Sequence, residues 1–489
     1  MHVSLALLLS AALPAQSAPL PNLDLAAGNL KHWEGEGFSV INEPLVGVSS
    51  ADDGRAKRTG VLYRTFVLPR DAGAITFRAA AVRPEGVEPG AALEVVLEGA
   101  ERKMAPRYIR TDKGLQSAPK LLPPVKGKPR EYVWNVEGFG GQTVRICAFD
   151  QDERPGCHVV CGGFTILSRD DHNGREFGDL MLRLCRENSL PPVTRFDSKR
   201  FLAVANADEP FVERQLLYCE TLYDLFFDHF RAKRFGVREP AGRLMVAVFD
   251  TPVGFESYIG RRMPNAVTGI YHTPSNRLVV YDYAKNRSFE ETKRLARAEA
   301  RRINSDLDRR RYIDTLNRRA SEFRTEANIG TVMHEVAHQL SFNCGMLNRE
   351  ADVPFWVAEG LATYCEATEN GAWQGIGEPN PERIQALAPA VHGQAPFIKL
   401  RDLAERDDWM RDTRTALMAY AQGWALFKML MEERPAQLRR FLETNFSRRT
   451  RDHRAADFAT AFGVEVDRLE LRFLEFVKEQ VERHTPVRR

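Results

Sequence analysis

Two histidines four residues apart constrain the fold of this chain more than any other feature. They lie in the segment His334-Glu335-Val336-Ala337-His338. Apolar residues recur every three or four positions from 329 to 340, which predicts a helix that ends at Asn343-Cys344-Gly345. On such a helix both imidazoles lie on one face and can reach a single metal ion. The glutamate between them can accept a proton from a metal-bound water.

The histidine pair alone is only moderately specific. A chain with 11 histidines in 489 residues contains such a match by chance in roughly two cases of a hundred, as an exposed helix with two idle histidines. A second segment, Phe355-Trp356-Val357-Ala358-Glu359-Gly360-Leu361-Ala362-Thr363-Tyr364, begins 17 residues after His338. A tetrahedral catalytic zinc needs three protein ligands and one open position. We therefore expect His334, His338 and Glu359 to bind Zn²⁺, and Glu335 to act as the general base.

These segments resemble the gluzincin metallopeptidases, particularly their aminopeptidase N-like branch, which pairs H-E-x-x-H with a glutamate in a W-L-N-E-G-F-A-type helix. Residues 356–362 match that helix, and Tyr420-Ala421-Gln422-Gly423 resembles the family's Tyr-x-x-Gly, 85 residues beyond Glu335. The resemblance implies a zincin-like α+β catalytic domain, zinc metallopeptidase activity, and stabilisation of the tetrahedral intermediate by Tyr420. The chain is also similar to secreted bacterial proteins with a peptidase-like domain.

Two departures from the family change the expected activity. Twenty residues separate His338 from Glu359, slightly more than in the family, so the connecting loop is longer. The Gly-x-Met-Glu-Asn segment with which aminopeptidases hold a free amine is absent, and the chain reads Thr268-Gly269-Ile270-Tyr271-His272-Thr273 where it should lie. An endopeptidase is therefore expected rather than an exopeptidase.

Three further polar residues are candidates for roles around the metal. Thr363 and Glu366 lie four and seven residues after Glu359, so they share its face of the helix. Either can orient a metal ligand, and the alternative for both is a place on the helix surface. His272, on a predicted strand, either lines the cleft or is structural.

Composition and the first residues indicate an exported protein. Net charge is +3 from 69 basic and 66 acidic residues, so the overall charge gives no case for nucleic acid or an anionic membrane. An apolar run followed by Pro14-Ala15-Gln16-Ser17-Ala18 predicts a signal peptide, residues 1–17, and a secreted or periplasmic location; an ordinary apolar N-terminus is the alternative. No later run is long and apolar enough to be a transmembrane segment.

Seven cysteines permit disulfides, and a Cys344–Cys365 bridge is weighed against two buried free thiols, which we favour.

Residues 18–170 are predicted to form an antiparallel β-sandwich accessory domain. Apolar and polar residues alternate at 60–68, 74–78, 93–97 and 143–147, and Gly and Pro clusters separate these runs. Segments around Trp33 and Trp134 resemble galactose-binding jelly rolls, which implies carbohydrate as a candidate ligand. A sandwich without a ligand is at least as well supported.

The rest of the chain is predicted to form the catalytic part. Residues 171–379 form an α+β domain, with a long helix at 211–235 and strands at 244–249, 267–271 and 277–281. An arginine-rich helical stretch at 289–323 has a narrow apolar stripe and is interpreted as a solvated amphipathic insertion, with a basic lid that recruits acidic substrates as the alternative. Residues 380–489 form a helical subdomain that completes the active site.

A secreted zinc-dependent peptidase that acts on peptide or protein substrates is the leading hypothesis. The alternative is a non-catalytic secreted protein that binds carbohydrate or protein and carries a peptidase-like domain. Glu335 argues against the alternative, because a domain that only binds has no need of a general base. A third hypothesis keeps the zinc but takes a glycan-linked or peptidoglycan peptide as substrate.

Overall fold

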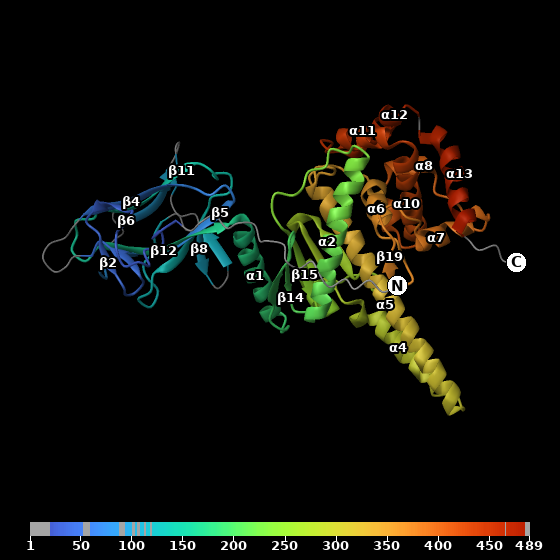
Figure 1. The fold of residues 1–489 in the computed structure, drawn as a ribbon, viewed down its shortest axis with the longest axis horizontal. Coiled ribbons are helices and arrows are strands. Elements are labelled where there is room, and N and C mark those ends of the chain that lie inside the picture. The colour runs from blue at the N-terminus through green and yellow to red at the C-terminus, as the bar shows by residue number, and fades with distance from the viewer. Residues whose placement is uncertain are drawn as a thin grey trace, which may run out of the picture. The chain divides into compact units, whose positions relative to one another are not determined.

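The computed structural model describes residues 20–51, 59–87, 93–99, 103–104, 108–111, 114–117, 120–464 and 466–484. The predicted signal peptide, residues 1–17, lies outside the described residues. The chain forms two compact units, Met1–Arg183 and Leu184–Arg489 (Figure 1). The division falls inside helix α1 (Arg169–Glu187), which begins where the sequence pattern changes from strand to helix.

The first unit is an antiparallel β-sandwich. Its two sheets have the strand orders β1-β4-β11-β6-β7 and β2-β3-β12-β5-β10-β8-β9. Alternating residues face a core in which the ring of Phe77 stacks on Trp134 at 4.2 Å and on Phe164 at 5.2 Å between centroids. The four strands predicted from alternation are confirmed. The strands are Glu34–Glu36, Ser39–Ile41, Gly47–Ser49, Gly60–Val67, Ala72–Val82, Leu93–Glu98, Lys103–Met104, Tyr108–Thr111, Gly114–Ser117, Arg130–Asn135, Thr143–Asp150 and His158–Ser168 for β1 to β12.

A mixed sheet and two long helices form the centre of the second unit. The strand order is β13-β14-β15-β17-β16, with β14, β15 and β17 parallel and the outer strands β13 and β16 antiparallel to their neighbours. Helices α2 (Glu209–Ala232) and α5 (Asp306–Asn343) pack against each other and against this sheet. The strands are Thr194–Asp197, Phe201–Ala205, Leu244–Phe249, Gly269–His272 and Arg277–Tyr281 for β13 to β17, and helix α3 is Pro252–Ile259.

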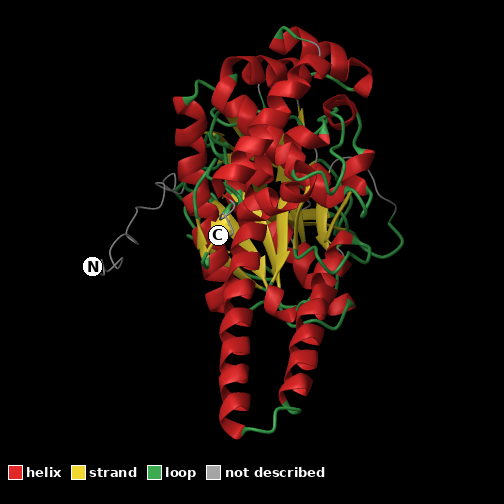
Figure 2. Ribbon diagram, turned by 90° about the vertical axis from the view of Figure 1, so that its right-hand side faces the viewer, coloured by secondary structure: helices red, strands yellow, loops and turns green. Residues whose placement is uncertain are grey.

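Helix α5 is longer than the sequence pattern suggests. The arginine-rich stretch is divided between α4 (Arg287–Ala300) and the first half of α5, and α5 then continues without a break through the two histidines. The side chain of Ser305 caps its start, and neither glycine nor proline occurs between residues 306 and 329 to end the helix. Residues 287–324, here called the arm, project from the body of the unit as two adjacent helices (Figure 2).

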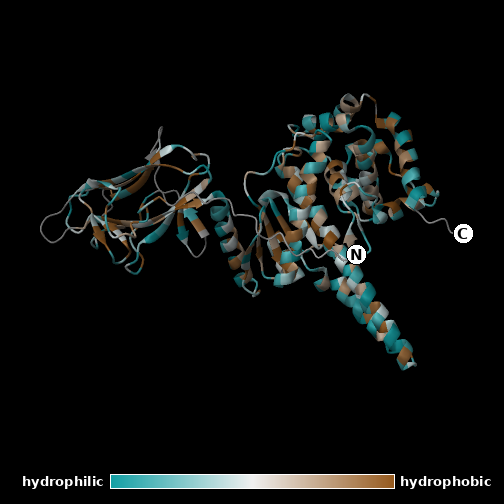
Figure 3. Ribbon diagram, viewed as in Figure 1, coloured by the Kyte–Doolittle hydropathy of each residue, from teal (hydrophilic) through white to brown (hydrophobic). Residues whose placement is uncertain are grey.

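The C-terminal part is helical, as predicted. Helix α6 (Phe355–Cys365) and a short hairpin, β18 (Thr368–Glu369) and β19 (Ala372–Trp373), precede seven helices. In Figure 3 brown and teal are mixed over the sheet and the helices around it, whereas the arm is largely teal. No helix among the described residues is long and apolar enough to cross a membrane. The seven helices are Pro381–Val391, Leu400–Glu405, Asp408–Arg411, Ala416–Glu433, Pro435–Asn445, Arg454–Phe462 and Val466–His484 for α7 to α13.

Cys344 and Cys365 are both buried free thiols. The proposed Cys344–Cys365 bridge is therefore wrong, and the alternative of two free thiols is correct. The Sγ of Cys344, at the end of α5, donates instead to the carbonyl of Ser341 at 3.5 Å, within its own helical turn.

Candidate metal centre

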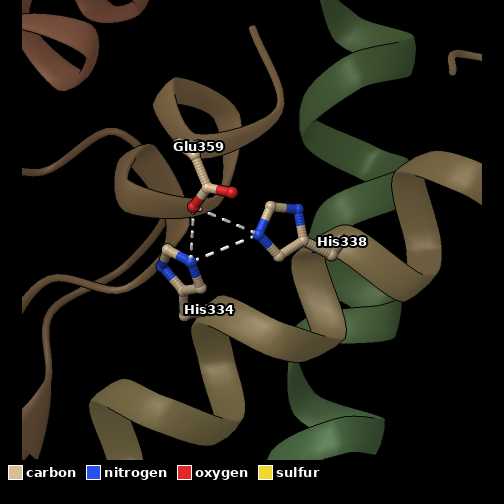
Figure 4. Close-up of side chains that lie close together, drawn as sticks. All are labelled: His334, His338 and Glu359. Carbon is tan, nitrogen blue, oxygen red and sulfur yellow. Dashed lines mark hydrogen bonds and ion pairs between the residues drawn. The ribbon is translucent and has the colours of Figure 1, made fainter. Parts of the chain in front are cut away.

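Two helices bring together three side chains of the kinds that can bind a metal ion. Helix α5 carries His334 and His338 one turn apart, and α6 carries Glu359 (Figure 4). The Nε2 atoms of the two imidazoles lie 3.2 Å apart. Oε2 of Glu359 lies 3.2 Å from Nε2 of His334 and 3.5 Å from Nε2 of His338. Within the described ranges, this is the group of His, Cys, Asp and Glu side chains that converges closely enough to hold a metal ion.

The separations between these three atoms fit a zinc ion. Zn–N and Zn–O bonds of about 2.0–2.1 Å at tetrahedral angles place neighbouring ligand atoms about 3.3 Å apart. The measured separations of 3.2, 3.2 and 3.5 Å lie on both sides of that value. Three protein ligands leave a fourth tetrahedral position open, which is typical of catalytic zinc sites rather than structural ones.

A buried carboxylate orients the first histidine. Oε2 of Glu366 lies 2.5 Å from Nδ1 of His334, so that nitrogen donates and the Nε2 lone pair faces the other two ligands. Oε1 of Glu366 accepts from Nδ2 of Asn380 at 3.0 Å and lies 2.7 Å from Nη2 of Arg383. The sequence pointed to Glu366, but it contained no signal for Asn380 or Arg383, which follow a hairpin and meet Glu366 only in the fold.

The charges around the three ligands favour a divalent cation. Burial alone would raise the pKa of Glu359, but the two imidazoles outweigh burial and hold that pKa well below its usual range. Burial also raises the pKa of Glu366, yet Arg383 and His334 bring it down to about 2. With Glu335 the site contains three carboxyl groups and one guanidinium. When all three are ionised, a dication between them neutralises the site.

Glu335 is held by the edge strand of the sheet. Its Oε2 accepts a hydrogen bond from the backbone N–H of Tyr271, in β16, at 2.6 Å. The helix can lie this close to β16 because residue 269 is glycine: a Cβ there would lie 2.5 Å from Cγ2 of Thr331 and 3.3 Å from Cγ of Glu335. The carboxylate therefore has a fixed position beside the metal ligands without belonging to their group.

Tyr420 reaches the site because two helices cross at glycines. A Cβ on Gly360, in α6, would lie 2.7 Å from the carbonyl oxygen of Gly423, in α10. This contact brings Tyr420, one turn before Gly423, next to Glu359, whose carboxylate raises the pKa of the tyrosine well above its usual range. The guanidinium of Arg383 lies 5.8 Å from the centre of the Tyr420 ring. The glycines in both sequence segments thus have a packing role.

Two of the candidates from the sequence do not touch a metal ligand's side chain. The Thr363 hydroxyl donates to the backbone carbonyls of Glu359 at 2.7 Å and Gly360 at 3.1 Å, within its own helix. His272 is half-buried, and its Nδ1 lies 2.7 Å from Oγ of Ser275. Both residues therefore have local structural roles.

A buried ion network anchors the helix that carries Glu359. Oδ1 of Asp407 accepts from the backbone N–H of Phe355, the first residue of α6, at 3.1 Å. Arg454, only 3% exposed, lies 2.7 Å from Asp407 and 2.8 Å from Asp352. Asp352 belongs to the connection between α5 and α6, so one arginine fixes both the longer loop and the helix that follows it.

Comparisons with known proteins identify a family match in the region of the site. Residues 328–451, which include the three ligands and Tyr420, match the family described as "Protein of unknown function (DUF1570)". No curated protein matches the chain.

Several solved structures are similar to the chain or to a part of it. TmCBM61 in complex with beta-1,4-galactotriose is 11% identical, over 31% of this chain and 99% of that one, with a TM-score of 0.22. A non-crystalline cellulose specific carbohydrate-binding module, CBM28, is 14% identical over 31% and 95%, with a TM-score of 0.20. The M60 catalytic domain with two CBM51 domains of Clostridium perfringens ZmpB is 11% identical over 96% and 42%, with a TM-score of 0.31. Because these TM-scores are low, the description of the fold and of the candidate site depends on the contacts and distances within this structure and not on these similarities.

Proposed function

We propose that this protein is a zinc-dependent peptidase that hydrolyses peptide bonds in extended substrates. The triangle of ligand atoms from His334, His338 and Glu359, with edges of 3.2, 3.2 and 3.5 Å, carries this proposal. When bound, zinc supplies a Lewis acid that lowers the pKa of water and polarises a carbonyl group. Glu366 supports the site by keeping the proton of His334 on Nδ1, which leaves Nε2 available as a ligand.

The other residues of the site have roles in moving protons and stabilising charge. Glu335 accepts the proton of the attacking water and delivers it to the leaving amine. Its hydrogen bond from Tyr271 holds one carboxylate oxygen, so the other can take the proton. Tyr420 donates a hydrogen bond to the oxyanion that develops during attack. Strand β16 is an edge strand, to which an extended peptide backbone can add as a further strand.

Non-catalytic binding is the alternative function. Two of the similar solved structures are carbohydrate-binding modules, which suggests carbohydrate as a ligand for the sandwich. The two functions are compatible in one chain, since the sandwich and the metal centre belong to different units. Only the peptidase requires Glu335, because binding alone needs no proton acceptor.

The purified, zinc-loaded protein incubated with a mixed peptide library provides the test. Products mapped by mass spectrometry should show internal cuts that are absent with Glu335→Gln, while zinc content stays the same in both proteins. Peptidoglycan fragments in a parallel reaction test the glycan-linked substrate. A library and fragments left intact by a protein with full zinc occupancy would refute the peptidase and leave the binding function.

A further inference from the structure

The arm differs in charge from the rest of the chain. Residues 287–324 contain eleven arginines and one lysine against seven acidic residues, an excess of five positive charges, whereas the entire chain has a net charge of only +3. The remainder of the protein is therefore slightly acidic. Because α4 and the first half of α5 project from the body in Figures 1 and 2, the positive charge is concentrated on one protruding element.

Most of these arginines have no ionic partner among the residues that the structure describes. Arg287, Lys293, Arg294 and Arg309 form ion pairs with neighbouring carboxylates. The other eight are exposed, and none forms an ion pair with any residue that the structure describes. Three of the eight, Arg297, Arg301 and Arg302, lie along the second half of α4 and at its end. These side chains carry charges that the fold itself does not neutralise.

The five remaining arginines lie along the first half of α5. They are Arg310, Arg311, Arg318, Arg319 and Arg324, and at 100° per residue they cover an arc of about 220° around the helix axis. A flat anionic surface touches only one side of a helix and would leave part of this arc unused. An extended polyanionic chain can follow such an arc.

The exposed apolar residues of the arm also argue against a membrane. Leu295, Leu307, Tyr312 and Phe323 are 58%, 59%, 38% and 54% exposed. Leu295 lies in the middle of α4, and at 100° per residue Leu307 lies on the other side of α5 from Tyr312 and Phe323. Phe323 lies near the base of the arm. Phe323 there packs against the rings of Phe289 and Tyr283 at 6.5 and 5.5 Å. Ile313, Leu316 and Ala320, which share one side of α5, are half-buried. The exposed residues alone therefore do not form the continuous apolar face with which an amphipathic helix enters a lipid interface.

The arm is rigidly connected to the metal centre. Helix α5 runs unbroken from Asp306 to Asn343, so Arg318 and His334 lie on one rod, about 24 Å apart at 1.5 Å per residue. An extended polypeptide covers this distance with about seven residues. A chain bound at the arm can therefore reach the metal centre with its next segment.

We infer that the arm is a docking surface for an acidic stretch of the polypeptide substrate, at least about seven residues from the bond that is cut. This inference rests on the proposed function. Arginine suits the task because its planar guanidinium binds carboxylates through two parallel hydrogen bonds, and eleven of the twelve basic residues of the arm are arginine. The arm would raise the local concentration of acidic substrates without taking part in the chemistry.

The first experiment measures binding without cleavage. Fluorescent peptides with a block of glutamates, or of glutamines as a control, are titrated against the full-length Glu335→Gln protein at low ionic strength. Arg310, Arg311, Arg318 and Arg319 are then changed to Gln together, which preserves helix propensity. We expect the acidic peptide to bind roughly tenfold more weakly to this arm variant, and the binding of both proteins to converge as salt screens the charges.

A matched variant controls for net charge. Arg214, Arg238, Arg440 and Arg468 are exposed, lie outside the arm, and form no ion pair with any described residue. Changing these four to Gln removes the same charge and should leave binding of the acidic peptide within about twofold of the parent. Equal losses in both variants would overturn the proposal, because net charge alone would then explain them.

The second experiment measures cleavage by the active protein. Peptides with one cleavable sequence carry the glutamate block at increasing distances on either side, and kcat/KM should rise when the spacer reaches about seven residues, on one side only. The arm variant should lose this increase but cut the glutamine peptides as well as the wild type. Binding of acidic peptides without any cleavage would refute the peptidase and not the docking surface. Arm-dependent binding of anionic vesicles or an acidic polysaccharide, but not of the acidic peptide, would refute the docking proposal.

Discussion

Substitutions at the buried pair of Glu366 and Arg383 test whether Glu366 orients His334 for zinc binding. Glu366 lies 2.5 Å from Nδ1 of His334, 3.0 Å from Nδ2 of Asn380 and 2.7 Å from Nη2 of Arg383, so every one of its neighbours is a donor. Glu366→Gln keeps the shape but leaves one acceptor oxygen. With that oxygen toward Arg383, the new amide donates to Nδ1 of His334 and moves the ring proton to Nε2, the ligand atom.

Two separate losses follow from this geometry. The wrong tautomer of His334 should weaken zinc binding by about 10–100-fold, or about 1.4–2.7 kcal/mol. The side chain of Arg383 is only 13% exposed, and the loss of its carboxylate partner should lower the free energy of unfolding by about 3–5 kcal/mol. The double variant Glu366→Gln/Arg383→Gln removes the buried charge, so it should recover much of the stability but not the zinc affinity.

Zinc affinity is measured by competition with a chelator, and stability by denaturant unfolding of the metal-free proteins. Glu369→Gln, an exposed position three residues further on, serves as the control and should change neither quantity. If Glu366→Gln binds zinc within about twofold of wild type, Glu366 does not orient His334. If the double variant regains zinc affinity together with stability, the single variant lost zinc only through misfolding.

Three more substitutions test the remaining residues of the site. Glu335→Gln should retain zinc but abolish hydrolysis, because it removes a proton acceptor and no ligand; metal analysis and a peptide assay check both, and surviving activity would exclude Glu335 as the base. Tyr420→Phe should leave zinc content unchanged and lower kcat by roughly 10²–10³; a near-normal kcat would mean that the tyrosine does not contact the oxyanion. Gly360→Ala should reduce stability by about 1–3 kcal/mol, because its Cβ would lie 2.7 Å from the Gly423 carbonyl oxygen. Gly330→Ala, whose Cβ would have no atom nearer than 4.0 Å, should be neutral or stabilising. Thermal unfolding of both variants and the wild type measures these changes.

Local patterns in the sequence predicted several elements of the fold and the three residues that we propose to bind zinc. Strands β15 and β17 occupy the predicted residues 244–249 and 277–281, because short runs of apolar, β-branched residues carry their own structural signal. His334 and His338 could be paired from their spacing alone, since four residues along a helix bring side chains to one face. Glu359 and Tyr420 were recognised from the residues around them.

The surroundings of these residues follow from the packing of distant segments. Arg383 and Asn380 meet Glu366 across a hairpin, and no periodic pattern encodes a contact between separate elements. In the chain β16 comes between β15 and β17, but in the sheet β17 pairs with β15 and β16 lies at the edge, beside Glu335. The crossing of α6 and α10 depends on Gly360 and Gly423, which lie 63 residues apart in the sequence. Glycine is needed at this crossing because the two backbones touch there. Spacing along one helix is a property of local geometry, whereas these contacts result from the packing of distant segments, which no single segment contains.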